Sequence, residues 1–299
     1  MLLGNGDGTF QPALNLDAGS LDPTSGIAAA DFNGDGITDF AVADFGGAAV
    51  AIMLSNGDGS FHAQPSLLRG TPTWAAAAGD LNGDGIGDLV VTKNLVPGAI
   101  QVLLSHGDGS FGPPITTPLP DCPGECGPVA LALADINGDG IPDVSVVDVG
   151  VGIVTLLGNG DTLRQSSVIP VDHLGTSTGS IAVGDFNNDR IPDLAIAIQG
   201  ANTVMVALGN GDGTFRPGMN FLVGQSPQSV AVADFNGDGF QDLVVTNLAS
   251  NNISVLLGHG NGTFDAAVNY ATPRVPRSVA VGDFNSDGIP DLAVTQDLD

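Results

Sequence analysis

The sequence predicts an all-β protein built from the four-stranded blades of a β-propeller, and three observations support this prediction. The 44 Gly and 19 Pro make up about a fifth of the 299 residues, well above their usual share. Glu and Lys, which are strong helix formers, occur once each, as Glu125 and Lys93. Four short strand patterns recur in repeats of about 50 residues, which is the size of a propeller blade.

Two motifs mark each repeat. The pattern Asp-x-Asn-x-Asp-x-x-x-Asp recurs at intervals of 49 to 55 residues, and we call its copies the aspartate loops: residues 31–39, 80–88, 135–143, 185–193, 234–242 and 283–291. A second pattern, close to Gly-Asp-Gly-Thr-Phe, forms what we call the glycine turns, which end at Phe10, Phe61, Phe111, Phe215 and Phe264, with a degenerate copy at 160–163. Together they account for nearly the whole chain, so we expect a single domain over residues 1–299.

The four strands of a repeat can be followed in the fifth copy. Residues 229–233 alternate small and β-branched side chains and lead into the aspartate loop. Residues 243–246 follow that loop and form a hairpin with the first strand, and residues 253–257 form the third strand. After the glycine turn, residues 264–270 form the fourth strand, with Phe264 packed between blades.

The two ends of the chain predict how the array closes. The chain begins on a third-strand pattern at residues 1–3 and ends after a second-strand pattern at 292–295. Pairing of these half-blades would complete six blades and remove exposed strand edges. An open solenoid of hairpins is the competing arrangement. The first strand is about two residues short, which also fits an excised piece of a longer array.

The charge excludes several partners. The chain has 33 acidic and 7 basic residues, for a net charge of −26, so we expect neither nucleic acid nor an anionic membrane surface as a partner. No apolar run approaches the roughly 18 residues of a membrane span, and the first six residues lack the basic and apolar regions of a signal peptide. The hydrophobic share of 42% is enough for a core, so the charge does not imply disorder.

The aspartate loops predict calcium sites. Side-chain oxygens occur at loop positions 1, 3, 5 and 9, and position 7 can offer its backbone carbonyl while its side chain packs inward. Calcium takes six to eight such oxygen ligands, so we expect up to six Ca²⁺ ions. The predicted ligands are Asp31, Asn33, Asp35, Ile37, Asp39; Asp80, Asn82, Asp84, Ile86, Asp88; Asp135, Asn137, Asp139, Ile141, Asp143; Asp185, Asn187, Asp189, Ile191, Asp193; Asp234, Asn236, Asp238, Phe240, Asp242; and Asp283, Asn285, Asp287, Ile289, Asp291.

Other interpretations of these loops were weighed. A metal-free Asx turn is the simplest, because Asp and Asn stabilise turns unaided, but three carboxylates in nine residues repel one another without a cation. Magnesium fits less well because it demands octahedral geometry. Catalytic use of the carboxylates is disfavoured by six equal copies. The fourth loop has Asn188 and Arg190 in place of glycines, so we expect the site at 185–193 to be the weakest.

These two motifs resemble FG-GAP (VCBS-type) repeats. The loops of the form Asp-Phe-Asn-Gly-Asp-Gly-Ile-Pro-Asp-Leu, followed by Leu-Leu-Gly-Asn-Gly-Asp-Gly-Thr-Phe, are similar to the calcium-binding blades of the integrin α-subunit propeller and to some secreted propeller lectins. The resemblance implies a propeller fold and calcium. Calcium sites of the millimolar type, together with the absence of cytosolic hallmarks, predict a secreted or cell-surface location. Members of this family often have seven blades, and their functions range from adhesion to sugar binding and domains attached to enzymes.

A partner is expected on the loops that vary between repeats. The second-to-third and fourth-to-first connections lie at the opposite end of the blades from the aspartate loops, and we call their surface the variable-loop surface. These loops also hold Cys122 and Cys126, for which a local disulfide is left open. Within this surface Trp74 and Tyr270 could stack on a sugar ring, and Arg69, Arg274 and Arg277 could meet a ligand's polar groups. Neutral drift of solvated loops is the alternative for any single residue.

Two function classes follow. The first is a calcium-stabilised extracellular module that binds a protein or glycan and has no catalytic role. The second is a carbohydrate-active enzyme, or an accessory domain of one, with its site on the variable-loop surface. The sequence has no nucleophile–base–orienter set, no His-rich metal site and no phosphate-binding Gly loop, so we expect no enzyme.

Overall fold

The computed structural model describes residues 24–44, 46, 48–95, 97–121, 127–171, 174 and 179–297. The described residues group into two compact units, one within residues 24–170 and one within residues 171–297, and each unit is described separately. In the described ranges every regular element is a β-strand except one 3₁₀ turn, Gln199–Ala201. None of the helical structure described is long and apolar enough to cross a membrane.

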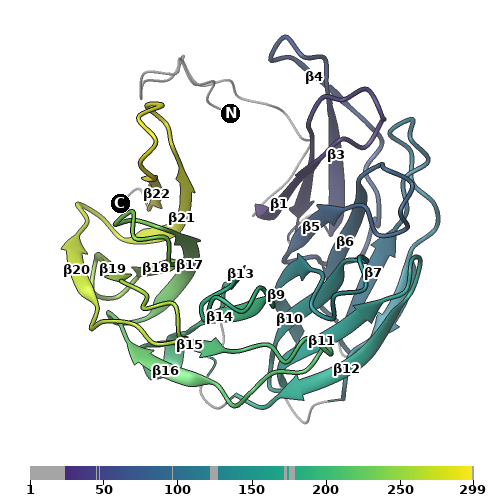
Figure 1. The fold of residues 1–299 in the computed structure, drawn as a ribbon. Helices are drawn as coiled ribbons and strands as arrows, with labels where there is room; N and C mark the ends of the chain where they lie inside the picture. The colour runs from purple at the N-terminus through teal and green to yellow at the C-terminus, as the bar shows by residue number, and fades with distance from the viewer. Residues whose placement is uncertain are drawn as a thin grey trace. The chain divides into compact units, whose positions relative to one another are not determined.

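The first unit contains three antiparallel four-stranded sheets, each with its strands in chain order (Figure 1). The first sheet comprises β1 (Thr24–Ala30), β2 (Asp39–Asp44), β3 (Ala49–Ser55) and β4 (Phe61–Ala63). The second comprises β5 (Ala76–Gly79), β6 (Asp88–Lys93), β7 (Ala99–Leu103) and β8 (Ile115–Pro118). The third comprises β9 (Gly127–Ala134), β10 (Asp143–Val149), β11 (Gly152–Gly158) and β12 (Leu163–Ile169).

The second unit contains two further four-stranded sheets and one hairpin. The fourth sheet comprises β13 (Ile181–Gly184), β14 (Asp193–Ile198), β15 (Thr203–Ala207) and β16 (Met219–Leu222). The fifth comprises β17 (Pro227–Ala233), β18 (Asp242–Asn247), β19 (Asn252–Leu256) and β20 (Val268–Ala271), and the hairpin β21 (Pro276–Gly282) and β22 (Asp291–Gln296) follows. This strand order confirms the predicted fold class, all-β with propeller blades.

The core lies between neighbouring sheets. One cluster joins the first and second sheets through Ile52 and Leu89, and another joins the second and third through Ile100 and Val146. In the second unit a third cluster joins the fourth and fifth sheets. The second sheet lies between the first and the third, and its strands β6 and β7 are almost entirely buried because hydrophobic side chains on both of its faces meet a neighbouring sheet.

The fourth strands differ from their predicted extent. In the fifth sheet Phe264 makes only an isolated bridge to Gly258, and β20 begins at Val268 rather than at Phe264. In the second and fourth sheets the residues after the glycine turn include Pro113 and Pro217, which have no N–H to donate to a ladder. The predicted closing strand at residues 1–3 lies outside the described residues, so closure of the sixth blade, and a single domain over residues 1–299, stay predictions.

Candidate metal-binding loops and their surroundings

Each aspartate loop joins the first and second strands of its sheet and folds around its position-1 carboxylate. In the fifth loop, Asp234 Oδ1 accepts the Gly237 N–H at 2.7 Å, and Oδ2 accepts the Gly239 N–H at 2.8 Å. The Gly239 bond is the main reason why the pKa of Asp234 lies below its usual value. In all six loops the position-1 carboxylate accepts the N–H groups of positions 5 and 6.

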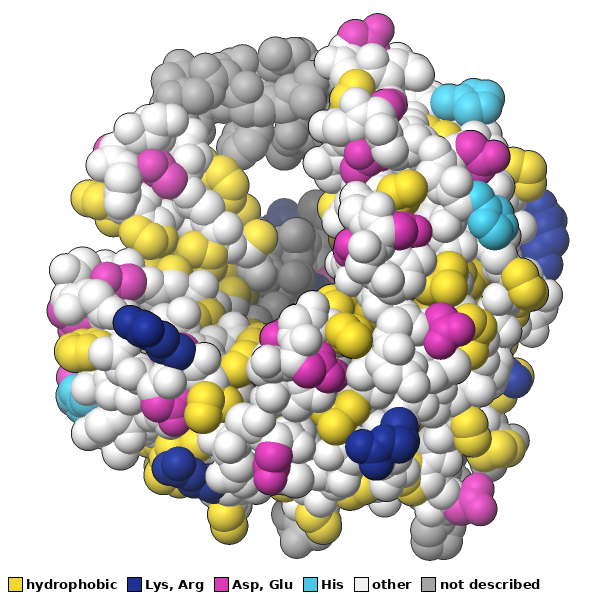
Figure 2. Space-filling model, turned by 45° about the vertical axis from the view of Figure 1, so that its right-hand side comes forward, with side chains coloured by type: hydrophobic (Ala, Val, Ile, Leu, Met, Phe, Trp, Pro, Cys, Tyr) yellow, Lys and Arg dark blue, Asp and Glu magenta, His cyan; other side chains and the backbone are white. Residues whose placement is uncertain are grey.

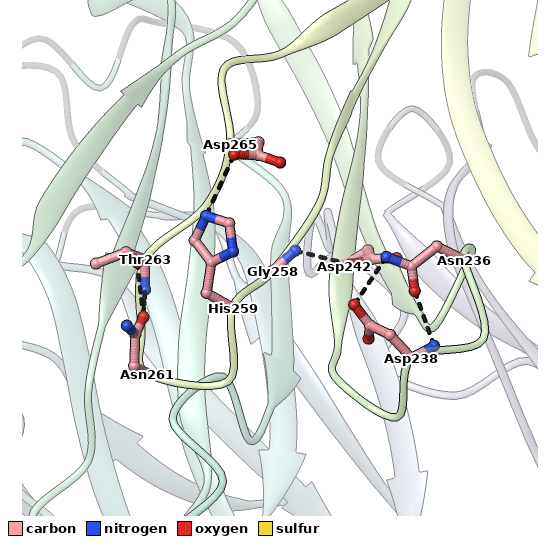
Figure 3. Close-up of polar contacts among 8 residues, drawn as sticks. All are labelled: Asn236, Asp238, Asp242, Gly258, His259, Asn261, Thr263 and Asp265. Atoms are coloured by element: carbon pink, nitrogen blue, oxygen red, sulfur yellow. Dashed lines mark hydrogen bonds and ion pairs between the residues drawn. The ribbon is translucent and has the colours of Figure 1, made fainter.

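Positions 3 and 5 face each other across the loop (Figure 3). Asn236 Nδ2 donates to Asp238 Oδ2 at 2.8 Å, and the Asp238 N–H donates to Asn236 Oδ1 at 2.9 Å. Asp238 Oδ1 accepts the Phe240 N–H at 2.8 Å. The same side-chain contact joins positions 3 and 5 in the first four loops. Carboxylate and amide oxygens are therefore gathered within a few residues.

The position-9 aspartate has a structural role that the sequence did not reveal. Asp242 is fully buried, and its Oδ2 accepts the Phe235 N–H at 2.8 Å while its Oδ1 accepts the Gly258 N–H at 2.7 Å (Figure 3). One carboxylate thus connects the aspartate loop to the end of the third strand. Burial raises its pKa, the two hydrogen bonds oppose this, and the nearby charges of Asp238 and Asp234 raise it further.

We call these two hydrogen bonds of the position-9 carboxylate, one to its loop and one to the third strand, the aspartate clamp, and the clamp recurs in the other four-stranded sheets. Asp39, Asp88, Asp143 and Asp193 are fully buried and bond both to position 2 of their own loop and to the end of the third strand. Burial raises the pKa of Asp193 to about 6. In the last hairpin Asp291 is only half-buried and accepts the Phe284 N–H at 3.1 Å.

Position 7 packs against the glycine turn of its own sheet. A Cβ on Gly260 would lie 2.2 Å from Phe240 Cδ1, and Gly260 has a φ of +63°. The turn therefore requires glycine for both space and backbone conformation. Ile37, Ile86 and Ile191 make equivalent contacts with Gly57, Gly107 and Gly211. The expected inward packing of this side chain is observed in these four loops, whereas Ile289 of the sixth loop is 59% exposed.

The fourth loop keeps the common backbone despite its two departures. Asn188 and Arg190 take φ values of 62° and 67°, in the left-handed region that glycine occupies in most of the other loops. The Arg190 N–H still donates to Asp185 Oδ2 at 2.8 Å. The loop is thus preserved at the cost of backbone strain, which for a residue other than glycine is about 1 kcal/mol or more.

The donor set of each loop fits a hard cation by its chemistry, although the carboxylates do not converge on one point. Among the described residues no group of three His, Cys, Asp or Glu side chains has the arrangement of a metal site, because positions 1, 5 and 9 turn towards backbone N–H groups. These are the hydrogen bonds of an Asx turn. Each carboxylate oxygen that accepts one N–H keeps a further lone pair that can bind a cation. In the described ranges the ion pairs are His259 with Asp265 and Arg277 with Asp297, and neither pair includes a carboxylate of an aspartate loop.

The glycine turns are stabilised by local hydrogen bonds. Asn261 Oδ1 accepts the backbone N–H of Thr263 at 2.9 Å and its hydroxyl at 2.6 Å (Figure 3). In the other turns Asp58, Asp108 and Asp212 take the same place, and hydrogen bonds from the following Ser or Thr hydroxyl lower their pKa. The N–H groups of His106 and His259 close these turns, as expected for turn residues.

The glycine turns of the second and fifth sheets also contact the aspartate loop of the preceding sheet. The Gly262 N–H donates to the carbonyl of Phe186 at 2.8 Å, and the Phe264 ring meets the Phe186 ring edge-on at a centroid distance of 5.7 Å. In the first unit the Gly109 N–H donates to the Phe32 carbonyl at 3.2 Å, and Phe111 meets Phe32 at 5.4 Å. An aspartate loop is therefore connected to two sheets, its own and the next.

The predicted partner residues fall in different places. Arg69 and Trp74 lie between β4 and β5 in the first unit, where Arg69 is exposed and Trp74 is half-buried. In the second unit Tyr270 lies on β20 with 54% of its surface exposed, Arg274 follows it, and Arg277 lies on β21. The Arg277 Nε donates to Asp297 Oδ1 at 2.9 Å, and its terminal nitrogen donates to Oδ2 at 2.8 Å, so this guanidinium already holds a carboxylate of the chain itself. Cys122 and Cys126 lie outside the described residues.

One further buried carboxylate lies at the end of β10. Asp148 is 2% exposed, it accepts a hydrogen bond from the Gly127 N–H, and its Oδ1 has no hydrogen-bond partner among the described residues. Burial raises its pKa to about 6. Position 6 of the second strand also holds Asp44, Lys93, Ile198 and Asn247 in other sheets. This mixture of residue types does not predict that the position is closed to solvent.

Comparison with known protein families gives one match. The family model described as FG-GAP-like repeat matches residues 31–91, 87–146, 135–196, 185–245 and 234–294. Each matched segment runs from one aspartate loop to the second strand of the next repeat. A search of curated proteins gives no match.

Solved structures that match this chain include three of different kinds. A functionally unknown protein from Desulfotomaculum acetoxidans DSM 771 has a TM-score of 0.62 and 14% identity, over 85% of this chain and 71% of that one. BBS1N, crystallised in complex with ARL6DN, has a TM-score of 0.66 and 12% identity, over 94% and 79%. The Photorhabdus luminescens Tc holotoxin pore has a TM-score of 0.46 and 18% identity over 94% of this chain, which spans 14% of the toxin chain. At these identities the first two likenesses concern the fold alone.

Proposed function

The chain belongs to the FG-GAP-like repeat family, and on that premise we propose that it is a calcium-binding propeller module that binds a protein or glycan partner. FG-GAP repeat propellers are typically non-catalytic modules of extracellular proteins. The aspartate loops would hold the cation through the side chains at positions 1, 3, 5 and 9 and the carbonyl of position 7. The variable-loop surface would hold the partner, in an extracellular setting where weak calcium sites are filled.

The observation that supports calcium most directly is the sixfold recurrence of the loop. In all six copies the N–H groups of positions 5 and 6 bond to the position-1 carboxylate, and the acidic side chains lie within nine residues of sequence. Burial raises the pKa of Asp39, and the nearby charges of Asp35 and Asp31 raise it further, as expected for carboxylates that repel one another. A bound Ca²⁺ would supply the opposite charge.

Calcium binding is tested by calorimetric titration of chelator-treated protein together with its thermal unfolding. For sites with a Kd of about 10⁻⁴ M, 5 mM Ca²⁺ stabilises the fold by about 2 kcal/mol per site, and Mg²⁺ does much less. Asp234→Ala should remove one site. Asp212→Ala, in the neighbouring glycine turn, is the matched control and should keep the stoichiometry. An unchanged melting temperature after calcium removal contradicts the proposal.

The partner is tested on the calcium-loaded chain with a glycan array and with cross-linking to extracellular proteins. Replacement of Trp74 or Tyr270 by Ala should weaken a partner held on the variable-loop surface by about tenfold or more, since buried aromatic residues dominate such interfaces. Binding that survives both substitutions would place the partner elsewhere. Hydrolysis of a bound glycan would favour the enzyme interpretation instead.

A further inference from the structure

A groove runs between the outer strands of the fourth and fifth sheets. It has a volume of about 480 Å³ and lies between β16 with Val223 on one side and residues 264–267 with Asn269 on the other. Its base holds the rings of Phe221 and Phe264, which meet edge-on at 5.2 Å. The groove belongs wholly to the second unit and lies apart from the predicted calcium ligands.

The strand that borders this groove has a free backbone edge. β16 is the last strand of its sheet and pairs only with β15 in the part of the chain that is described. The Val223 N–H donates to Asn202 on the β15 side at 3.1 Å, so in this regular antiparallel register residues 219, 221 and 223 face β15. The N–H and C=O groups of Asn220 and Leu222 therefore point outward, where another strand could pair with them.

Exposed apolar side chains lie on this edge strand. Seven large hydrophobic residues are exposed in the described ranges, and two of them, Met219 and Leu222, lie on β16. Leu222 is 77% exposed. A free strand edge beside exposed apolar side chains is the arrangement used to bind extended peptides.

The charge of the groove indicates which peptide would fit. Asp265 follows the phenylalanine of its glycine turn, whereas the equivalent residues of four other repeats are His62, Gly112, Arg164 and Arg216. Its carboxylate is exposed, and the nearest basic group is His259, with Nε2 at 3.2 Å. A second copy of the chain is a poor occupant because each copy carries a net charge of −26. A basic residue in the partner would meet Asp265 favourably.

We propose that this groove binds an extended peptide that adds to the edge of β16, with an apolar residue over the groove and a Lys or Arg at Asp265. The peptide's backbone would pair with Asn220 and Leu222, and its basic side chain would give the preference for one peptide over another. This is a second binding surface, separate from the variable-loop surface, and it does not depend on calcium being the ligand of the aspartate loops.

The test uses the full chain in calcium and a labelled peptide, acetyl-Thr-Val-Lys-Val-Lys-Val-Thr-amide, with binding followed by fluorescence anisotropy. Asp265→Asn should weaken binding about threefold at low salt, as for an exposed ion pair. Asp212→Asn, an exposed carboxylate in the preceding glycine turn, is the matched control and should have no effect. A peptide with Glu in place of both Lys residues should bind at least tenfold more weakly than the parent peptide.

The backbone contact is tested separately. Leu222→Pro removes an outward N–H without removing a bond to β15, and should weaken binding about tenfold more than Leu222→Ala does. If the proline variant does not fold, a peptide N-methylated at its central Val tests the same backbone pairing, because the methyl group removes an N–H of the peptide instead of one of β16. Any of four results would overturn the proposal. The methylated and parent peptides bind equally, the two Asp variants have equal effects, oligosaccharides displace the peptide, or the peptide does not bind at millimolar concentration.

Discussion

Arg190 adopts a backbone conformation that is unfavourable for a residue other than glycine. Its φ of 67° is one that glycine adopts freely and other residues adopt at a cost. Its side chain is exposed, so replacing it removes no packing. The local backbone, not a contact, decides what a substitution does at this position.

Arg190→Gly should therefore raise the free energy of unfolding by up to about 1 kcal/mol, the relief of strain being offset in part by the greater freedom of glycine in the unfolded chain. Chemical denaturation measures this. Arg216→Gly is the control, because Arg216 has no positive φ and should lose stability or stay unchanged. If the aspartate loops bind calcium, Arg190→Gly should also raise the calcium affinity of the loop at 185–193. A titration that shows no gain in calcium affinity contradicts the prediction that this site is the weakest.

Asp242 and Asp238 lie in one loop but have different surroundings. Asp242 is buried with both oxygens bonded to N–H groups, so Asp242→Asn turns one acceptor into a donor that faces another donor. We expect a loss of about 2–3 kcal/mol in the free energy of unfolding, measured in chelator so that metal binding does not contribute. Asp238→Asn, on the exposed side of the loop, should cost less than about 1 kcal/mol. Equal losses would contradict the clamp.

At the scale of the strand, the buried Asp148 at the end of β10 makes stability depend on pH. Its pKa of about 6 in the folded state lies above the ordinary value of 3.8, so the folded state holds the proton more tightly than the unfolded one. Stability from this group is therefore greatest below about pH 4 and declines as the pH rises to about 6.

Asp148→Asn should abolish this decline. Between pH 4 and pH 7 the parent should lose roughly 2 kcal/mol relative to the variant, as judged from denaturation curves of the two proteins at each pH. The comparison is between slopes, so it holds whatever the amide itself costs. Parallel pH profiles for the two proteins would show that Asp148 does not titrate in this range.

The contact between neighbouring sheets depends on the phenylalanine of the glycine turn. Phe264 is buried against the rings of Phe186 and Phe221. Phe264→Ala should cost about 3–4 kcal/mol of unfolding free energy. Phe264→Leu, which keeps most of the volume, should cost less than half as much. Similar losses for the two variants would show that ring geometry matters more than filled volume.

The regular elements were largely predictable, and the differences have physical causes. The first three strands of the fifth repeat were predicted to within about two residues, because periodic patterns and turn residues specify them locally. The fourth strand was predicted to begin four residues too early, since the pattern does not show that Phe264 turns into the space between sheets. The clamp at Asp242 was missed because its partner, Gly258, is distant in sequence.

The loop positions that could hold a cation were visible in the sequence because the spacing repeats six times. What the sequence could not show is that the oxygens at positions 1, 5 and 9 turn to backbone N–H groups in this structure. The groove beside β16 also escaped prediction. Asp265 differs from His62, Gly112, Arg164 and Arg216 at the equivalent position. The sequence does not show that this carboxylate lies in a groove beside the free edge of β16.

For the whole molecule, the acidic charge is the property with the widest effect. On the surface in Figure 2, Asp and Glu side chains recur, whereas Lys and Arg occur singly. Six bound Ca²⁺ ions would reduce the formal charge from −26 to about −14. Repulsion among the loops should therefore be strong without the metal and much weaker with it.

Salt should thus act differently on the two states. Raising NaCl from about 20 mM to 500 mM should increase the melting temperature of the chelator-treated protein by several degrees, because screening reduces the repulsion. The calcium-loaded protein should change less. Scanning calorimetry at both salt concentrations measures the difference, and an equal response of the two states would mean that the loop charges do not limit stability.

The contact between a glycine turn and the preceding aspartate loop has a consequence for how such a chain can evolve. The pairs Phe32 with Phe111 and Phe186 with Phe264 are built from the same two motif positions, one from each neighbouring repeat. Every repeat that keeps both motifs therefore brings a matching surface for the repeat before it and the repeat after it. Duplication or loss of a whole repeat would leave a junction of the same kind, so repeat number can change without new packing having to be found.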